Sequence, residues 1–203
     1  MKVLVSCESS GTVREAFRKL GHDAWSCDIL PADDDSPYHY MGDCINVIQK
    51  GWDLIIGHPP CTALAVSGNS TYAYGMPKHQ KRLDAIKWTE DLWQLMCANA
   101  TYVCMENPVG VLSTQSNIKT KPQYIQPYQF GHAESKKTGL WLHNLPKLKD
   151  SNNVKDEFDS LPKNQQQRLH YLPPSPDRWK IRSKTYQGIA DAMADQWGGL
   201  NNG

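Results

Sequence analysis

Apolar runs and an amphipathic segment alternate over the first thirty residues of the chain. Residues 2–7 and 23–29 are mostly apolar and are typical of buried strands, whereas residues 12–20 repeat apolar side chains at helical spacing and stop at Gly21. The order strand, helix, strand predicts a βαβ unit. Because the second strand ends near the acidic residue Asp28, this unit is typical of the opening of a doubly wound sheet that binds nucleotides.

The same patterns predict the later elements. Apolar runs predict strands over residues 52–57 and 101–105, and amphipathic spacing predicts helices over residues 81–100 and 186–197. The apolar stretch at residues 139–142 predicts a hairpin.

Three stretches break this periodicity. Residues 31–40 form a polar loop, and residues 108–130 are rich in loop-forming side chains. Residues 150–167 have almost no apolar periodicity, and we interpret them as a mobile insertion.

Composition narrows the class of protein. A length of 203 residues favours one α/β domain, or one domain with a short appendage. Hydrophobic residues make up 39% of the chain, with 7 Trp and 9 Tyr, which excludes wholesale disorder. No apolar run approaches the roughly 20 residues of a membrane span, so we expect a soluble, cytoplasmic protein without a membrane partner.

Cysteine spacing and charge add two expectations. The 6 cysteines form no Cys-x-x-Cys pair and no Cys/His ligand spacing, which argues against a zinc site or a disulfide framework, so we expect no metal. Residues 1–60 carry 5 Lys/Arg against 9 Asp/Glu, a net charge of −4, which leaves 17 against 12 and a net charge of +5 for residues 61–203. The basic second part permits a polyanionic partner.

A cysteine and a glutamate follow two of the predicted strands. Cys61 comes after residues 52–57 and a Pro-Pro pair, which fixes two φ angles and removes two backbone donors. Glu106 follows residues 101–105. Because open α/β sheets build their sites at the carboxyl ends of their strands, a thiol and a carboxyl group can share one cleft.

Around these residues the sequence resembles the cytosine-5 DNA methyltransferase family, in a compact form like that of phages and bacteria. Pro59-Pro60-Cys61 is similar to the family's Pro-Pro-Cys motif, and Glu106-Asn107-Pro108 is similar to its Glu-Asn-Val motif. Asp28 and Asp43 match two acidic positions at strand ends, and Tyr186-Gln187-Gly188-Ile189-Ala190 looks like the final motif. The motifs follow the family's order through most of the chain.

The resemblance implies both a fold and a division of the chain. The fold is the Rossmann-like doubly wound α/β sheet of S-adenosylmethionine-dependent methyltransferases, with a small recognition insertion. Residues 1–139 would form the catalytic and cofactor-binding domain, and residues 140–183 a short variable insertion. Residues 184–203 would return to the catalytic domain as a C-terminal helix.

The resemblance also implies a covalent mechanism. A thiolate that adds to carbon 6 of cytosine converts the ring into an enamine, whose carbon 5 attacks an electrophilic methyl group. Cys61 would be this nucleophile. Glu106 would hydrogen-bond to N3 of the ring and stabilise the charge that addition moves there.

S-adenosylmethionine is the methyl donor that the resemblance implies. Residues 7–11 occupy the place of the family's Phe-x-Gly-x-Gly loop, with one glycine where the family has several, and the following helix N-terminus would meet the methionine end. Asp28 would accept hydrogen bonds from the ribose, and Asp43 would bind the adenine amino group. The expected cofactor-binding residues are Cys7, Glu8, Ser9, Gly11, Asp28, Ile29, Asp43, Cys44, Pro59, Gly188 and Ile189.

DNA is the expected partner, since basic residues stand where the family contacts its substrate. The family's Gln-x-Arg-x-Arg motif is missing, and Lys136 or Lys137 would hold the base or a phosphate in its place. A cytosine stacked in a duplex cannot reach Cys61, so DNA as substrate implies base flipping. The expected nucleic-acid contacts are Lys136, Lys137, Arg178, Lys180, Arg182 and Lys184. Because residues 140–183 are short, we expect modest sequence discrimination, or specificity supplied by a partner protein or a homo-oligomer.

Other interpretations stay open at this point. The same chemistry acting on RNA or on a free cytosine nucleotide fits a small recognition region. A nonenzymatic module that binds DNA or protein on a degenerate methyltransferase fold fits the altered cofactor loop. Taken singly, Glu106 fits a helix-capping carboxylate and each aspartate fits a turn.

Overall fold

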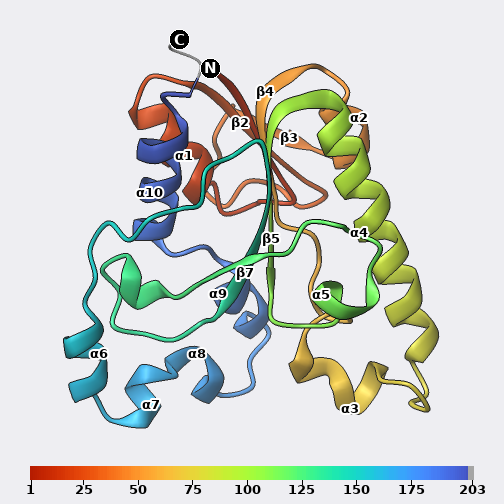
Figure 1. The fold of residues 1–203 in the computed structure, drawn as a ribbon, viewed down its shortest axis with the longest axis vertical. Helices are drawn as coiled ribbons and strands as arrows, with labels where there is room; N and C mark the ends of the chain where they lie inside the picture. Colours follow the sequence, from red (N-terminus) through yellow and green to blue (C-terminus); the bar gives the residue numbers. More distant parts are fainter. Residues whose placement is uncertain (201–203) are drawn as a thin grey trace.

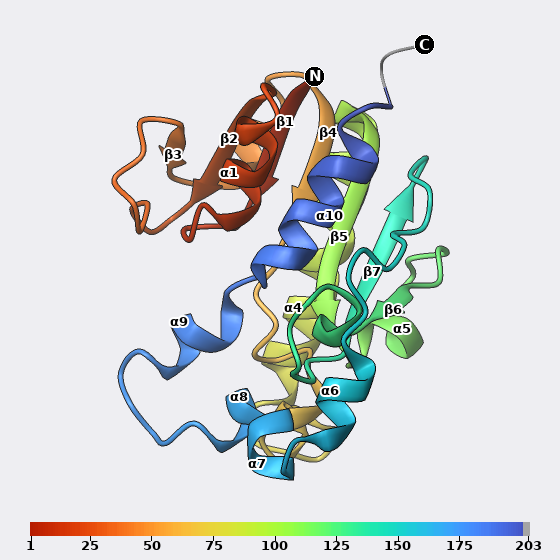
Figure 2. The ribbon, with the colours of Figure 1, turned by 90° about the vertical axis from the view of Figure 1, so that its left-hand side faces the viewer.

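Seven strands form the central sheet of the chain, which a computed structural model describes over residues 1–200 (Figure 1). The strand order is β3-β2-β1-β4-β5-β7-β6, and Figure 2 shows the strands side by side in this order. Neighbouring strands from β3 to β5 are parallel, whereas β7 is antiparallel to both β5 and β6. The strands are β1 (Lys2–Ser6), β2 (Asp23–Asp28), β3 (His39–Met41), β4 (Trp52–Gly57), β5 (Ala100–Pro108), β6 (Gln123–Ile125) and β7 (Thr138–His143).

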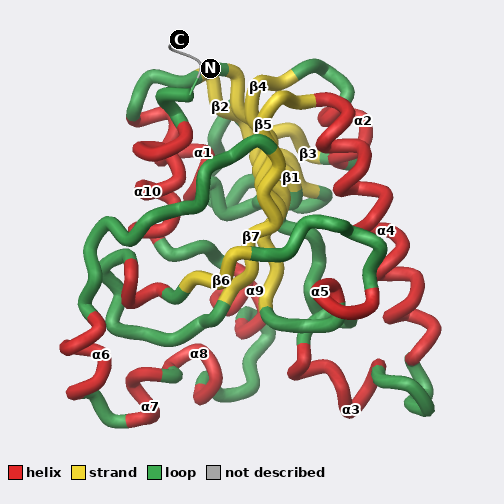
Figure 3. The backbone as a smooth tube through the Cα atoms, viewed as in Figure 1, coloured by secondary structure: helices red, strands yellow, loops and turns green. Residues whose placement is uncertain are grey.

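Helices cover both faces of this sheet (Figure 3). On one face lie α1 (Thr12–Lys19) and α10 (Gln187–Trp197), and on the other lie α2 (Cys44–Ile48) and α4 (His79–Asn99). Each layer has its own buried cluster: Phe17 and Trp197 belong to the first, and Met96 to the second. The expected doubly wound α/β fold class is therefore confirmed.

Short helices and loops complete the chain. They are η1 (Val66–Gly68), α3 (Asn69–Tyr72), α5 (Leu112–Gln115), η2 (Pro127–Gln129), α6 (Lys155–Ser160), α7 (Lys163–Gln166), α8 (Arg168–Tyr171) and α9 (Arg178–Ser183). Three of them, α3, α5 and α9, lie beyond the carboxyl ends of β1 and β4 (Figure 1). No helix within residues 1–200 combines the length and the apolar character that crossing a membrane requires.

The polar segment 150–167 holds more structure than its sequence pattern predicted. It contains α6 and α7, and the ring of Phe158 packs against Tyr128 at 5.0 Å between centroids. The Gln166 amide donates to the backbone oxygens of Phe158 and Leu161. These helices are too short to show a hydrophobic period, so the sequence pattern did not predict them. The interpretation of the segment as a mobile insertion stays a prediction.

The strand β7 completes the sheet. It spans residues 138–143 and lies between β5 and β6, so the predicted hairpin strand has partners on both sides. The chain leaves the sheet after His143. The division at residues 140 and 184 into domain, insertion and returning helix stays a prediction.

Candidate active site

Backbone hydrogen bonds align the carboxyl ends of three neighbouring strands. The His58 amide, directly after β4, donates to the Ser6 oxygen at the end of β1 (2.9 Å). The Glu8 amide donates to the Cys27 oxygen of β2 (3.0 Å). The loops after β1, β2 and β4 therefore open onto the same edge of the sheet, as expected for a doubly wound fold.

Two side-chain hydrogen bonds tie the Pro-Pro-Cys loop to β5. His58 Nδ1 lies 2.9 Å from Glu106 Oε2, and the Asn107 amide nitrogen donates to the Pro59 oxygen at 3.0 Å. Asn107 and Pro59 are buried, so this contact is shielded from water. The structure thus brings together the two motifs that sequence analysis placed on neighbouring strands.

Glu106 is an ionised carboxylate in this setting. Its side chain is only 15% exposed, and burial opposes ionisation, but the hydrogen bond and charge of His58, the charge of Lys136 and the Thr138 hydroxyl outweigh burial and lower the pKa of Glu106. A carboxylate can only accept, so the shared proton of the His58 pair lies on Nδ1. The other ring nitrogen of His58, Nε2, is buried and has no partner among residues 1–200.

Cys61 is a neutral thiol in the same setting. Burial raises the pKa of Cys61, and the nearby negative charge of Glu106 raises it further. The positive charges of Lys136 and Arg182 act in the opposite direction. A thiolate at Cys61 therefore requires that the charge of Glu106 be removed or that more positive charge approach.

The two lysines of the basic turn separate in space. Lys136 Nζ donates to the Lys184 oxygen at 3.2 Å, and its charge acts on both Cys61 and Glu106. Lys137 Nζ instead lies 4.9 Å from the ring centre of Tyr124, on the edge strand β6. Of the two candidates for a role at the base, the structure places Lys136 with the site and Lys137 away from it.

The predicted nucleic-acid contacts on α9 differ in how far they are already engaged. Lys180 Nζ forms an ion pair with Asp33 Oδ1 at 2.8 Å, and Arg178 donates to the His170 oxygen at 3.2 Å. Arg182 is exposed, and its charge acts on Cys61. The ion pair of Lys180 reduces the positive charge that α9 presents to a ligand.

The loop after β1 is organised differently from the expected cofactor loop. The Glu8 carboxylate accepts from the backbone amides of Val13 (2.8 Å) and Arg14 (3.3 Å), which are the first-turn donors of α1. Glu8 is buried, so it caps this helix from within. The helix N-terminus that was expected to meet the methionine end is therefore occupied by the chain's own carboxylate.

Residues at the ends of β2 and β3 fit the adenosine part of the expected cofactor. Asp28 Oδ1 accepts from the Leu30 amide (3.0 Å), which leaves its second oxygen for a ribose hydroxyl, and the neighbouring apolar side chain of Ile29 is 77% exposed. Asp43 accepts from the Ile45 amide and caps α2. A ribose requires a hydrogen-bond acceptor for its hydroxyl groups, and an adenine ring requires an apolar surface to pack on; Asp28 and Ile29 offer these two features side by side.

Other predicted cofactor residues fall into two groups: Cys7 and Cys44 contact each other, whereas Gly188 and Ile189 pack elsewhere in the fold. Cys7 has a positive φ of 59° and its thiol lies 3.8 Å from Cys44 Sγ, a bond that raises the pKa of Cys7. Gly188 meets the backbone of Phe130, and Ile189 is buried in the core between α10 and the sheet. Contact of Ser9, Gly11, Gly188 and Ile189 with a cofactor stays a prediction. No group of His, Cys, Asp and Glu side chains in residues 1–200 is arranged to hold a metal ion.

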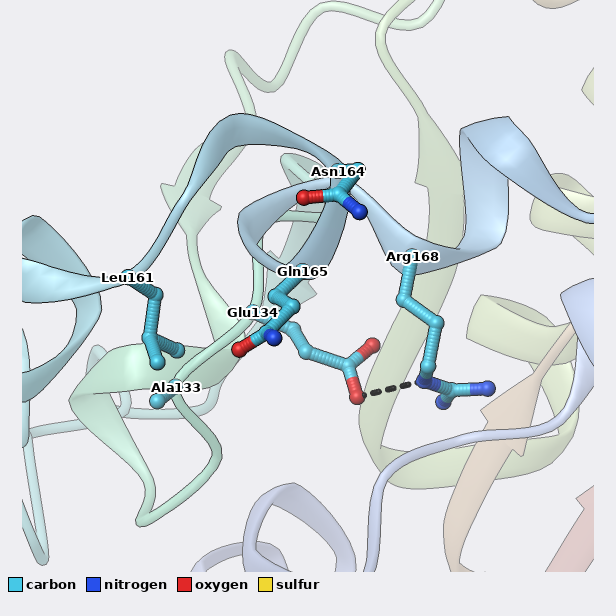
Figure 4. A pocket seen from close by; sticks show the side chains of 6 residues that line it. All are labelled: Ala133, Glu134, Leu161, Asn164, Gln165 and Arg168. Carbon is cyan, nitrogen blue, oxygen red and sulfur yellow. Dashed lines mark hydrogen bonds and ion pairs between the residues drawn. The ribbon is translucent and has the colours of Figure 1, made fainter.

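A cavity of about 480 Å³ lies away from these residues, between the loop after η2 and α7 (Figure 4). Its charged wall consists of Glu134 and Arg168, whose Oε1 and Nε lie 2.8 Å apart. Tyr186 donates to the other oxygen of Glu134 at 2.6 Å. Because these partners satisfy each other, the cavity offers no free charge for chemistry.

His58 belongs to the candidate site, but the sequence did not point to it. Its partner Glu106 is 48 positions away, so no spacing rule relates them. The only signal was a titratable residue between a buried strand and Pro-Pro, at the edge where the sheet builds its site.

Comparison with known proteins identifies the fold. No family model and no curated protein matches the sequence. Similar solved structures include the methyltransferase EhMeth of Entamoeba histolytica, with 13% identity and a TM-score of 0.52 over 76% of this chain and 57% of that chain. The S. pombe Dnmt2 methyltransferase has 17% identity and a TM-score of 0.47 over 89% of this chain and 61% of that chain. An E. coli prophage protein described as a DNA modification methyltransferase has 16% identity and a TM-score of 0.46 over 80% of this chain and 56% of that chain. The chain spans less than two thirds of the length of each. The likeness to EhMeth shows that the two chains share a fold.

Proposed function

We propose that this chain is an S-adenosylmethionine-dependent methyltransferase that modifies carbon 5 of cytosine in DNA through a covalent Cys61 adduct. One observation carries the proposal: two hydrogen bonds, His58 to Glu106 and Asn107 to Pro59, hold the Pro-Pro-Cys loop against a carboxylate on the next strand. A loop that served only as a turn would not need a buried amide and an imidazole to fix it there.

The protonation states of Cys61 and Glu106 suggest how the nucleophile is activated. The resting site holds one proton, on the thiol, because the pKa of Cys61 is raised by burial and that of Glu106 is lowered by His58 and Lys136 despite burial. Two negative charges at this edge repel each other, so ionisation of Cys61 favours protonation of Glu106. Transfer of that single proton produces a thiolate and a neutral carboxyl donor together.

Both products of this transfer are needed at a cytosine. The thiolate forms a bond to carbon 6, and the electron pair of the ring moves toward N3, where the protonated Glu106 donates its hydrogen bond. Carbon 5 of the resulting enamine takes the methyl group. The proton on carbon 5 is then lost to water, and its electron pair expels the sulfur from carbon 6 as a thiolate. This thiolate takes back the proton held on Glu106, which restores the resting site and releases the product.

The residues at the ends of β2 and β3 would hold the donor. S-adenosylmethionine, when bound, supplies the electrophilic methyl group. Asp28 would accept from its ribose, and the exposed Ile29 would cover the adenine ring. Glu8 keeps α1 capped, since its carboxylate accepts from the Val13 and Arg14 amides of the first turn.

Positive charge around Cys61 favours a nucleic-acid substrate. Lys136 and Arg182 both lower the pKa of Cys61 against burial, and neither forms an ion pair within the described chain. They can therefore meet phosphate groups that flank a base presented to Cys61. A base in a duplex must be flipped to reach this partly buried thiol.

Covalent trapping tests the proposal. The purified chain is incubated with labelled S-adenosylmethionine and duplex DNA, RNA or dCMP, each with cytosine or 5-fluorocytosine, and analysed by intact mass. Fluorine cannot leave carbon 5 as a proton does, so we expect an adduct with the fluorinated DNA and methyl transfer to ordinary DNA. Cys61→Ser should lose both, because a hydroxyl is hardly ionised near neutral pH.

Cys97→Ser is the matched control, since Cys97 lies in α4. It should retain trapping and turnover. An adduct that maps to another cysteine, or that persists in Cys61→Ser, contradicts the assignment of the nucleophile. Transfer to RNA or dCMP without transfer to DNA contradicts the assignment of the substrate.

A further inference from the structure

A second cavity, of about 420 Å³, lies between α3, α5 and the first turn of α4. Figure 1 shows these three elements together below the carboxyl end of the sheet. Side chains that line the cavity include Asn69, Tyr74, His79, Arg82, Val111 and Gln115, and none of its lining residues is acidic. The cavity is separate from the corner that fits the adenosine of the cofactor.

Arg82 is a buried cation that has no counter-ion among the described residues. The residue is 2% exposed, and its Nε and Nη1 donate to the Ala63 oxygen (2.7 Å) and to Asn69 Oδ1 (2.9 Å). Its Nη2 is buried and has no partner among residues 1–200, and none of the ion pairs of this part of the chain includes Arg82. Because a guanidinium stays protonated, an unpaired and buried one is costly unless an anion offsets its charge.

The N-terminus of α4 also favours an anion at this cavity. The 21-residue helix α4 begins at His79, has no acidic side chain in its first turn, and receives no side-chain bond from Lys78 at its N-cap. The positive end of its dipole therefore points toward the cavity wall without compensation. The amides of His79 and Lys81 already donate to Met76 and Lys78, so side chains rather than amides would bind a ligand.

We propose that this cavity is a phosphate-binding site in which Arg82 Nη2 is the principal donor. Of the common biological anions, phosphate matches the planar guanidinium and the remaining donors of the wall, the Asn69 and Gln115 amides. Nη2 itself is covered in the ligand-free chain, so a phosphate reaches it when the wall shifts locally. Tyr74, which is 90% exposed, contributes a weakly held part of that wall.

The position of the cavity connects it to the Cys61 loop. Arg82 donates to Ala63, two residues after Cys61, and the Val111 amide donates to the Leu64 oxygen at 2.9 Å. An anion bound to Arg82 therefore lies one hydrogen bond away from the segment that carries Cys61. This last step rests on the proposed function: the phosphate then belongs to the substrate, either to a DNA backbone or to a nucleotide.

An added carboxylate tests the site without removing Arg82, which also braces the loop. Leu83 lines the cavity and is 43% exposed, so Leu83→Glu supplies an internal anion to the same wall. The control Leu20→Glu makes the same change at a leucine that is 50% exposed at the end of α1. Inorganic phosphate should raise the melting temperature of the wild-type chain and of Leu20→Glu, but not of Leu83→Glu.

Binding of two phosphate sources then identifies the ligand. Loss of one charge-assisted contact corresponds to a roughly 10- to 150-fold weaker Kd. In one outcome, Leu83→Glu binds a short DNA duplex more weakly than Leu20→Glu by this factor, and the slope of log K against log salt concentration is lower by about one. The source of the phosphate is then the DNA backbone. If the weaker binding is seen only with dCMP, the source is a phosphate monoester.

The outcomes separate this proposal from the proposed function. Absence of a phosphate effect on the wild-type chain, or an equal effect on all three chains, overturns the phosphate site. Phosphate binding that depends on Leu83 in a chain that transfers no methyl group leaves the site standing and refutes only the enzymatic proposal. Arg82→Lys, which keeps the charge but loses the fork, should show intermediate binding.

Discussion

The hydrogen bond between His58 and Glu106 makes a quantitative prediction about catalysis. His58→Ala removes a donor that lies 2.9 Å from a carboxylate whose side chain is 15% exposed. A hydrogen bond to a charged group contributes about 1.5–3 kcal/mol, which corresponds to a roughly 10- to 150-fold change in an equilibrium or a rate. We expect kcat/KM for methyl transfer to fall by a factor in this range.

The pH dependence of this variant follows from the direction of the pKa shift. His58 lowers the pKa of Glu106 against the effect of burial, so its removal should raise that pKa. The proposed active state carries one proton on the pair Cys61 and Glu106, so the acid limb of kcat/KM reports Glu106 and the alkaline limb reports Cys61. His58→Ala should therefore move the acid limb to higher pH and narrow the plateau.

A conservative variant separates positioning from packing. The amide nitrogen of asparagine occupies nearly the place of Nδ1, so His58→Asn should retain the hydrogen bond and recover most of the lost rate. The measurement is a pH series of initial rates for the three chains, with thermal melts to verify folding. An acid limb that stays in place in His58→Ala, or an asparagine variant as impaired as the alanine variant, would refute the reasoning.

Three further predictions concern other parts of the site and the fold. Lys136→Met should raise the pKa of both Cys61 and Glu106, because the lysine charge lowers each, and so should move the whole pH–rate profile of methyl transfer to higher pH. Arg182→Gln should move only the alkaline limb of that profile. A profile that is unchanged in Lys136→Met would contradict the placement of this lysine. Asp28→Ala should weaken S-adenosylmethionine binding in calorimetry with little change in the melting temperature, because its side chain bonds only to a neighbouring loop amide; equal affinity would remove Asp28 from the donor site. Gly188→Ala should destabilise the chain by about 1–3 kcal/mol in denaturant unfolding, because the new Cβ would lie 1.9 Å from the Phe130 backbone oxygen, whereas Gly199→Ala, with nothing within 4 Å, should be nearly neutral.

The sheet could be predicted from the sequence because its signals are local. The strands β1, β2 and β4 each contain a short stretch of mostly apolar residues, and the parallel arrangement places their carboxyl ends at one edge. Prediction of β5 was less accurate at its end. It continues to Pro108, beyond the expected residue 105, because Pro108 pairs with Thr138 of an antiparallel neighbour that sequence patterns do not reveal.

The candidate site could be predicted only in part, because its charges are set by distant partners. The sequence placed Glu8 in the cofactor loop, but not that its carboxylate would cap α1. It placed Lys180 among the DNA contacts, but Asp33, far away along the chain, pairs with it. A side chain's type indicates which interactions it can form, whereas the packing of separate segments decides which one it uses.

Arg82 shows why this limit matters for finding function. In the sequence it stands in a run of Lys78, His79 and Lys81 at the start of a helix, which is typical of a solvated basic end. Only the fold buries its guanidinium against Ala63 and Asn69 and leaves one nitrogen without an acceptor in the described part of the chain. Since an unpaired buried charge opposes folding, its presence beside the Cys61 loop is better explained by a ligand anion than by stability. The same reasoning applies to His58, whose buried Nε2 also has no hydrogen-bond partner among residues 1–200.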